Sequence, residues 1–192
     1  MKTVRFLVVI AAMSVACSPP PSPPPAAPAP AAPVVRPPPP RPLPTATAAA
    51  IIRDPSGKQV GSITLADTYA GLLIIGSVGD LGLGAHAIHI HAIGKCEAPF
   101  TTAGAHFNPT NRQHGYRSPT GPHLGDLPNL DLPAAGREKF EILLPNVTLK
   151  GEHALLDADG ASVVIHAERD DYTADPSGNS GGRIACGVIV PK

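Results

Sequence analysis

Several runs of the chain after residue 58 are rich in apolar and β-branched residues, and one of them alternates apolar and polar positions in the manner of a half-buried β-strand. In Gln59–Leu65, for example, Val60, Ile63 and Leu65 stand among Gly and Ser residues. Further runs rich in Val, Ile and Leu cover residues 71–78, 85–93, 139–144, 161–167 and 184–190. Turn-forming clusters at residues 54–57, 79–80 and 157–160 separate these runs, and no segment shows a sustained helical stripe. The pattern predicts an all-β fold, a barrel or sandwich of about eight strands.

Two long stretches interrupt the strand pattern. Residues 94–130 are dense in Gly, Pro, His and Asn, and residues 170–183 are rich in Gly, Asp and Ser. A loop of more than about 15 residues is uncommon in a compact domain unless it is functional or disordered. The first loop contains His106, His114 and His123, so metal coordination would explain how it stays ordered.

The first 16 residues have the features of a signal peptide. Lys2 and Arg5 give a positive start, and the apolar stretch at residues 6–12 is too short to cross a membrane comfortably. The tetrapeptide Ser14–Cys17 resembles a bacterial lipoprotein signal, in which the cysteine becomes the lipidated N-terminus. We therefore expect a signal peptide at residues 1–16 and a lipid on Cys17, with a plain signal peptide or a buried cysteine as the alternatives.

Residues 18–44 hold fifteen of the 25 prolines in the chain. Such a segment lacks most backbone donors and has little to bury, so it should be an extended spacer. If Cys17 carries lipid, residues 17–44 would tether a folded domain to a membrane; without lipid they would be a disordered leader. Residues 45–192 are long enough for one domain with its own core.

Composition narrows the range of partners. The formal net charge is zero, with 15 basic and 15 acidic residues and no basic block, so nucleic acid is not expected to bind. Tryptophan is absent and aromatic residues are few, which leaves no stacking platform for bases. If lipid occupies Cys17, then Cys96 and Cys186 form a pair that an exported protein would oxidise to a disulfide, two free thiols being the alternative.

The histidines carry the candidate chemistry. His89 and His91 lie one residue apart in an apolar run, so on a strand both rings project from the same face. Neutral imidazole is the commonest protein metal ligand and suits copper and zinc. Together with later residues, this pair has the spacing of a two-metal site: His89, His91, His106, His114, His123, Asp126 and His166.

In these motifs the chain resembles the copper/zinc superoxide dismutases, specifically their exported bacterial branch. The matching stretches are His89–His91, Gly104–Pro109, His114-Gly115, His123–Leu127, Val164–His166 and Gly182–Ile189. The resemblance spans residues 59–191. It implies an eight-stranded Greek-key β-barrel with long metal-binding and electrostatic loops, which residues 45–192 would form.

The resemblance also implies two cofactors, one copper and one zinc. The copper ligands would be His89, His91, His106 and His166, and the zinc ligands would be His106, His114, His123 and Asp126. His106 would bridge the two metals as an imidazolate. Three imidazoles and a carboxylate independently suit tetrahedral zinc, and four imidazoles suit copper.

Four further residues gain implied roles from the resemblance. Asp170 would accept hydrogen bonds from the outer nitrogens of His89 and His114 and so fix both rings. Cys96 and Cys186 would form the disulfide of the family. Arg183 would attract and orient the superoxide anion beside copper.

The implied function is conversion of superoxide to dioxygen and hydrogen peroxide by alternate reduction and reoxidation of copper. An exported, lipid-anchored enzyme of this kind would protect the cell envelope from superoxide formed outside the cytoplasm. Members of the branch occur as monomers and as dimers, so the resemblance leaves both a monomer and a homodimer as alternatives. The alternative is a copper-binding or copper-delivery lipoprotein on the same fold. A third reading, a zinc-stabilised β-domain that presents a binding surface, leaves His89, His91 and His166 unexplained.

Overall fold

A computed structural model describes residues 46–192, and this part of the chain is built from β-strands and loops. In chain order the elements are β1 (Thr47–Arg53), β2 (Gln59–Thr68), β3 (Gly71–Gly79), β4 (Gly84–His86), β5 (Ile88–His91), the 3-10 turn η1 (Thr101–Ala103), β6 (Leu130–Leu132), β7 (Arg137–Leu144), β8 (Ser162–His166), β9 (Arg183–Val188) and β10 (Val190–Pro191). The all-β prediction is confirmed. The expected signal peptide, Cys17 anchor and proline-rich tether lie outside the described residues.

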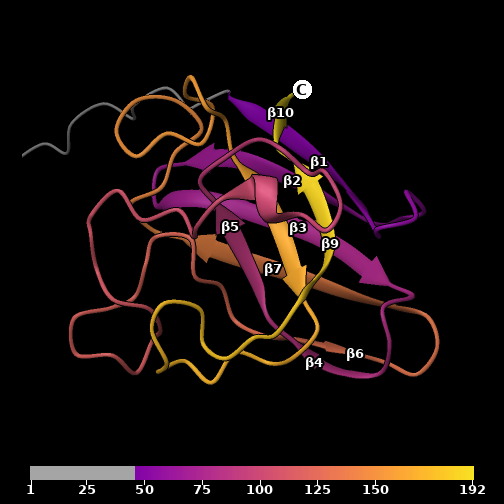
Figure 1. Ribbon diagram of the computed structural model, residues 1–192. Coiled ribbons are helices and arrows are strands. Elements are labelled where there is room, and N and C mark those ends of the chain that lie inside the picture. The colour runs from indigo at the N-terminus through magenta and orange to yellow at the C-terminus, as the bar shows by residue number, and fades with distance from the viewer. Residues whose placement is uncertain (1–45) are drawn as a thin grey trace, which may run out of the picture. The chain divides into compact units, whose positions relative to one another are not determined.

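The main sheet is antiparallel and runs in the order β5-β8-β9-β1-β2-β3-β7, with β10 added beside β1. The spatial sequence β9-β1-β2-β3, in which a late strand returns beside the first, is a Greek key. Strands β4 and β6 form a separate two-stranded sheet. Figure 1 shows the main sheet curling back on itself, so that β5 and β9 cross in front of β3 and β7.

The core lies between the two halves of this curled sheet and follows from the alternation in the sequence. Ala48, Ala50 and Ile52 of β1 are buried, and residues of β2, β3, β8 and β9 join them in one apolar cluster. Strand β5 is different, because all four of its residues are buried. Its isoleucines face the core, so by the period of two its histidines face the opposite side, where loops must cover them.

The two long loops supply that cover. The backbones of His89 and His91 form isolated bridges with Asp126 and His106 of the first loop. The second loop joins β8 to β9 and contacts the first at its far end, where the amide of Arg117 donates to the carbonyl of Tyr172 (2.9 Å). Within residues 46–192, no helix has the length and apolar character needed to cross a membrane.

Two strands were not expected from the pattern of the sequence. Strand β1 is rich in alanine, which has little intrinsic preference for strands, and it forms because it pairs with β2 on one side and with β9 and β10 on the other. Strand β6 has only three residues and pairs with β4. The single run expected at residues 85–93 is two short strands that pair with different partners, β4 with β6 and β5 with β8.

Candidate metal centre

The buried face of β5 gathers the sequence-predicted histidines into two adjoining clusters. His89, His91, His106 and His166 offer ring nitrogens that all lie within 4.8 Å of one another. A second set of the same compactness is His89, His106, His114 and Asp126. His89 and His106 belong to both sets. The ring centroid of His106 lies 4.1 Å from that of His89 and 5.2 Å from that of His114.

In the first cluster, three rings have one nitrogen held by the protein and the other left free. His89 Nε2 lies 2.9 Å from Asp170 Oδ2, and His91 Nδ1 lies 2.9 Å from the Gly104 carbonyl oxygen. His166 Nδ1 lies 3.1 Å from Ser180 Oγ. A carbonyl or carboxylate oxygen can only accept, so on His89 and His91 the engaged nitrogen carries the proton and the other presents a lone pair.

These lone pairs are buried without a partner among the described residues. His89 Nδ1, His91 Nε2 and His166 Nε2 make no hydrogen bond. A buried polar atom left without a partner costs about 1–3 kcal/mol, so several of them in one place need an explanation. Neutral imidazole nitrogens that converge in this way are a donor set for a metal ion, and they fit copper or zinc.

The second cluster converges on one carboxylate oxygen. Asp126 Oδ1 lies 2.9 Å from His106 Nδ1, 3.1 Å from His114 Nδ1 and 3.2 Å from His123 Nδ1. His123 Nδ1 is also only 3.4 Å from His106 Nδ1. Three imidazole nitrogens around one carboxylate oxygen form a closed N/O set that fits tetrahedral zinc.

Burial keeps three of these rings neutral. Burial, together with the charge of neighbouring imidazoles, lowers the pKa of His91 to about 2 and that of His166 to about 3. Burial also lowers the pKa of His106 to about 4, against the opposing effect of its hydrogen bond to Asp126. Burial opposes protonation of His114 too, but hydrogen bonds to Asp126 and Asp170 outweigh it and raise its pKa to about 9.

Asp170 connects the two clusters. Its Oδ2 holds His89 Nε2, and its Oδ1 lies 2.9 Å from His114 Nε2. Burial alone would raise its pKa, but the hydrogen bonds from the two rings hold the pKa of Asp170 below its ordinary value. Gly178 (φ 66°) packs so closely here that a Cβ would meet the Asp170 carboxylate and lie 2.6 Å from His114 Nε2, so this position requires glycine.

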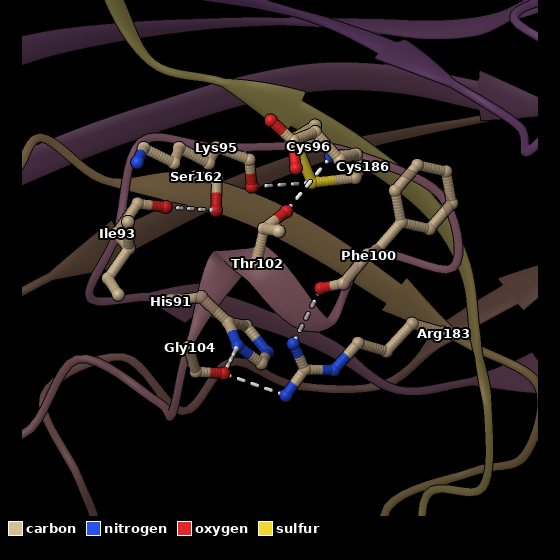
Figure 2. The surroundings of a disulfide bond; sticks show 11 residues. His91, Ile93, Lys95, Cys96, Phe100, Thr102, Gly104, Ser162, Arg183 and Cys186 are labelled. Carbon is tan, nitrogen blue, oxygen red and sulfur yellow. Dashed lines mark hydrogen bonds between the residues drawn. A yellow bond between two sulfur atoms is a disulfide. The ribbon is translucent and has the colours of Figure 1, made fainter.

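Arg183 lies at the opening of the centre. Its Nη1 donates to the Phe100 carbonyl (2.6 Å) and its Nη2 to the Gly104 carbonyl (2.7 Å), the same oxygen that accepts from His91. Figure 2 shows the guanidinium held between these two carbonyls beside the ring of His91. A guanidinium has five N–H donors, so further donors stay available for an anion.

A cleft of about 500 Å³ leads to this point and is lined by His106, His166 and Arg183 together with Thr101, Pro176 and Ser177. An arginine and two imidazoles of the centre thus share one opening.

The Cys96–Cys186 disulfide is formed, as expected, with the two Cα atoms 5.6 Å apart. Cys186 belongs to β9, three residues after Arg183, and Cys96 belongs to the loop that supplies the carbonyls around Arg183 (Figure 2). Phe100, Ala103 and Val164 pack with the disulfide in a small apolar cluster of their own. The bridge and this cluster hold η1 and its flanking residues against β8 and β9.

The sequence motifs did not reveal three residues that contact the centre. Ser180 Oγ holds His166, Asp175 Oδ1 accepts from the His114 amide (2.7 Å), and the Tyr116 hydroxyl donates to the Asp126 carbonyl (2.6 Å). Each contact depends on how the two loops meet, and a lone Ser, Asp or Tyr in a polar loop gives no signal of its own.

His86 of β4 lies outside both donor sets. It is buried, and its Nδ1 lies 2.9 Å from the His166 carbonyl oxygen.

The fold and the centre together define a class: a Greek-key β-protein that buries two adjoining metal-donor clusters with a shared imidazole. Comparison with known proteins narrows this class. Residues 59–189 match the family model described as copper/zinc superoxide dismutase. The chain belongs to the copper/zinc superoxide dismutase family. It is an enzyme of this class, and copper and zinc are its cofactors.

Relatives at about 40% identity agree with this assignment. Copper-zinc superoxide dismutase 1 of Aquifex aeolicus (strain VF5) is 42% identical over 142 residues, which cover 72% of this chain and 84% of the relative. An extracellular copper-zinc superoxide dismutase of Haemonchus contortus is 38% identical over 138 residues, 69% of this chain and 74% of the relative. A crystal structure of a double mutant of a superoxide dismutase-like protein from Bacillus subtilis superposes with a TM-score of 0.71 at 41% identity, covering 74% of this chain and 96% of that one.

Proposed function

We propose that this protein converts superoxide to dioxygen and hydrogen peroxide in the cell envelope, at a centre in which His106 is shared by copper and zinc. The observation that carries the proposal is the set of lone pairs on β5 and β8. The free nitrogens of His89, His91 and His166 converge beside a separate carboxylate-centred cluster, and the cleft to them passes Arg183.

In this proposal each donor cluster takes a different metal. The four imidazoles suit copper, whose ligands are His89, His91, His106 and His166. The carboxylate-centred set suits zinc, whose ligands are His106, His114, His123 and Asp126. His106 serves both, because Nδ1 faces Asp126 and Nε2 is left for the copper cluster.

The protein side of the reaction follows from Arg183 and His106. When bound, copper supplies a one-electron couple, whereas zinc has no redox chemistry of its own. Arg183 provides positive charge and N–H donors at the opening, where they attract the superoxide anion and orient it. When not bound to copper, His106 Nε2 would hold one proton, and this proton together with one from solvent would go to the product. Two superoxide anions and two protons thus yield one dioxygen and one hydrogen peroxide.

Asp170 and the disulfide have supporting roles in this reaction. Asp170 fixes His89 and His114, which would be ligands of copper and of zinc respectively. The Cys96–Cys186 bridge keeps the carbonyls that hold Arg183 in place. Neither group needs to touch the substrate to affect the rate.

We place the enzyme outside the cytoplasm. Oxidation of Cys96 and Cys186 fits an oxidising compartment, and a relative described as extracellular supports export. We further propose that residues 1–16 are removed, that Cys17 carries lipid, and that residues 17–44 tether the catalytic domain, residues 45–192, to a membrane. Mass spectrometry of the mature N-terminus tests the anchor, because an unmodified or absent Cys17 contradicts it.

The test of the function is the rate of superoxide consumption by the protein loaded with one copper and one zinc, with metal analysis of the same sample. We expect a rate near the diffusion limit of about 10⁹ M⁻¹s⁻¹ that is lost when copper is removed. A His166→Ala variant should lose copper and activity, and His153→Ala, outside the centre, should keep both. Stoichiometric copper with negligible turnover would contradict the proposal and favour the copper-delivery alternative.

A further inference from the structure

The three free lone pairs of the copper cluster belong to rings whose outer nitrogens meet three different oxygens. His89 meets the Asp170 carboxylate and His91 meets the Gly104 carbonyl. His166 meets a hydroxyl, since Ser180 Oγ lies 3.1 Å from its Nδ1, while the Gly181 carbonyl oxygen is farther away at 3.4 Å. The nearer partner of His166 is therefore a side chain, which a substitution can remove.

The position of this hydroxyl is well determined. Ser180 is only 1% exposed. Its carbonyl accepts from the Glu168 amide (2.9 Å), and its own amide donates to the Ser177 carbonyl (3.3 Å). Backbone contacts on both sides of the loop thus hold Ser180 against His166, and burial keeps water from replacing its hydroxyl.

A hydroxyl differs from a carbonyl because it can both donate and accept. When His166 Nε2 gives its lone pair to a metal, Nδ1 must carry the proton, and Ser180 Oγ accepts it. The stronger the acceptor on the outer nitrogen, the more basic the ligating nitrogen becomes, which favours the more highly charged metal ion.

We propose that Ser180 is a positioning residue that orients the His166 ring and stabilises oxidised copper relative to reduced copper. The inference rests on the proposed function, because it takes His166 as a copper ligand. Without the hydroxyl, only the more distant Gly181 carbonyl could accept from Nδ1, so the ring would be a weaker and less fixed donor. Oxidised copper would then lose more binding free energy than reduced copper.

The experiment is a spectroelectrochemical titration of the copper- and zinc-loaded protein and three variants. Ser180→Ala should lose about tenfold in its preference for oxidised over reduced copper, which is a rise in potential of about 59 mV for one electron. Ser180→Thr keeps the hydroxyl and should stay close to the parent protein. Thr173→Ala is the matched control, because it removes a hydroxyl that bonds the Asp171 carbonyl (3.2 Å) in the same loop. An unchanged potential in Ser180→Ala, or an equal rise in Thr173→Ala, would overturn the proposal.

A second measurement uses the parent protein and needs no variant to fold. In the reduced, diamagnetic form, the His166 Nδ1 proton should exchange slowly and show a nuclear Overhauser effect to the Ser180 β-protons. Absence of that contact would contradict the role of Ser180. Failure of the proposed function is a separate result: copper bound with an unaltered electron paramagnetic resonance spectrum in His166→Ala would remove His166 from the ligand set, whatever Ser180→Ala does.

Discussion

Mild acid should destabilise the metal-free protein steeply. His91, His106 and His166 are each at most 7% exposed, and burial lowers their pKa values to about 2, 4 and 3. In the unfolded chain each ring would titrate near 6.5. Between pH 6.5 and about 4 the unfolded chain therefore binds protons that the folded chain does not, and stability falls as the pH falls through this window.

The magnitude follows from the number of rings. One proton of difference changes the free energy of unfolding by about 1.4 kcal/mol per pH unit, so three approach about 4 kcal/mol per pH unit near pH 5. His114 has the opposite shift: its pKa is raised to about 9, so its stabilising contribution is fully present below pH 6.5 and is lost as the pH rises through 9. His114 therefore does not contribute to the change in stability between pH 6.5 and about 4. A loss of about 4 kcal/mol per pH unit is a large part of the free energy of unfolding, which is typically about 5–15 kcal/mol for a domain.

The assay is urea unfolding of the metal-free protein, in the presence of a chelator and at constant ionic strength, at several pH values from 7 to 5. We expect the midpoint to fall steeply with an unchanged m-value. A His91→Gln variant should reduce the slope by about 1.4 kcal/mol per pH unit, while His153→Gln should leave it unchanged. Loading with both metals should move the transition to lower pH, because a bound imidazole cannot take up a proton. A fall in the free energy of unfolding of less than about 1.4 kcal/mol between pH 6 and pH 5, which corresponds to less than one proton, would refute the reasoning.

Three further predictions concern residues around the metals. Arg183→Ala should keep both metals but lose about tenfold or more of the rate at low ionic strength, and unchanged turnover there would exclude charge guidance by this residue. Reduction of the Cys96–Cys186 bridge, which spans 90 residues of sequence, should cost about 4 kcal/mol and lower the melting temperature, so a constant melting temperature would count against its stabilising role. Asp170→Asn should weaken zinc and copper binding about 10–100-fold in a chelator competition. The side-chain amide has one acceptor oxygen, so it cannot accept hydrogen bonds from both rings. Unchanged affinities would show that other contacts fix the rings.

The β-strands that carry the pattern of period two could be predicted from the sequence. Ile63 and Leu65 are buried on β2 as their alternation indicated, and the all-β class followed from several apolar runs. Val60 is also buried, but it lies three residues before Ile63, where the register between β1 and β2 shifts at an irregularity that the alternation did not reveal. The Ala-rich strand β1 could not be predicted in the same way. Its position depends on hydrogen bonds to β2, β9 and β10, which come from distant parts of the chain. Short or alanine-rich strands exist because partners pair with them, and that information is not local.

For the metal centre, the sequence by itself determined which donors are available. His89 and His91 lie on one face of a strand because successive side chains point to opposite faces, and the residue types and spacing of the other motifs indicate copper and zinc. The tertiary structure alone decided which nitrogen of each ring is free. That choice depends on the Asp170 carboxylate, the Gly104 carbonyl and the Ser180 hydroxyl, which are 81, 13 and 14 residues from the rings they hold. A backbone carbonyl is the same in every residue, so only the fold can show which one meets an imidazole.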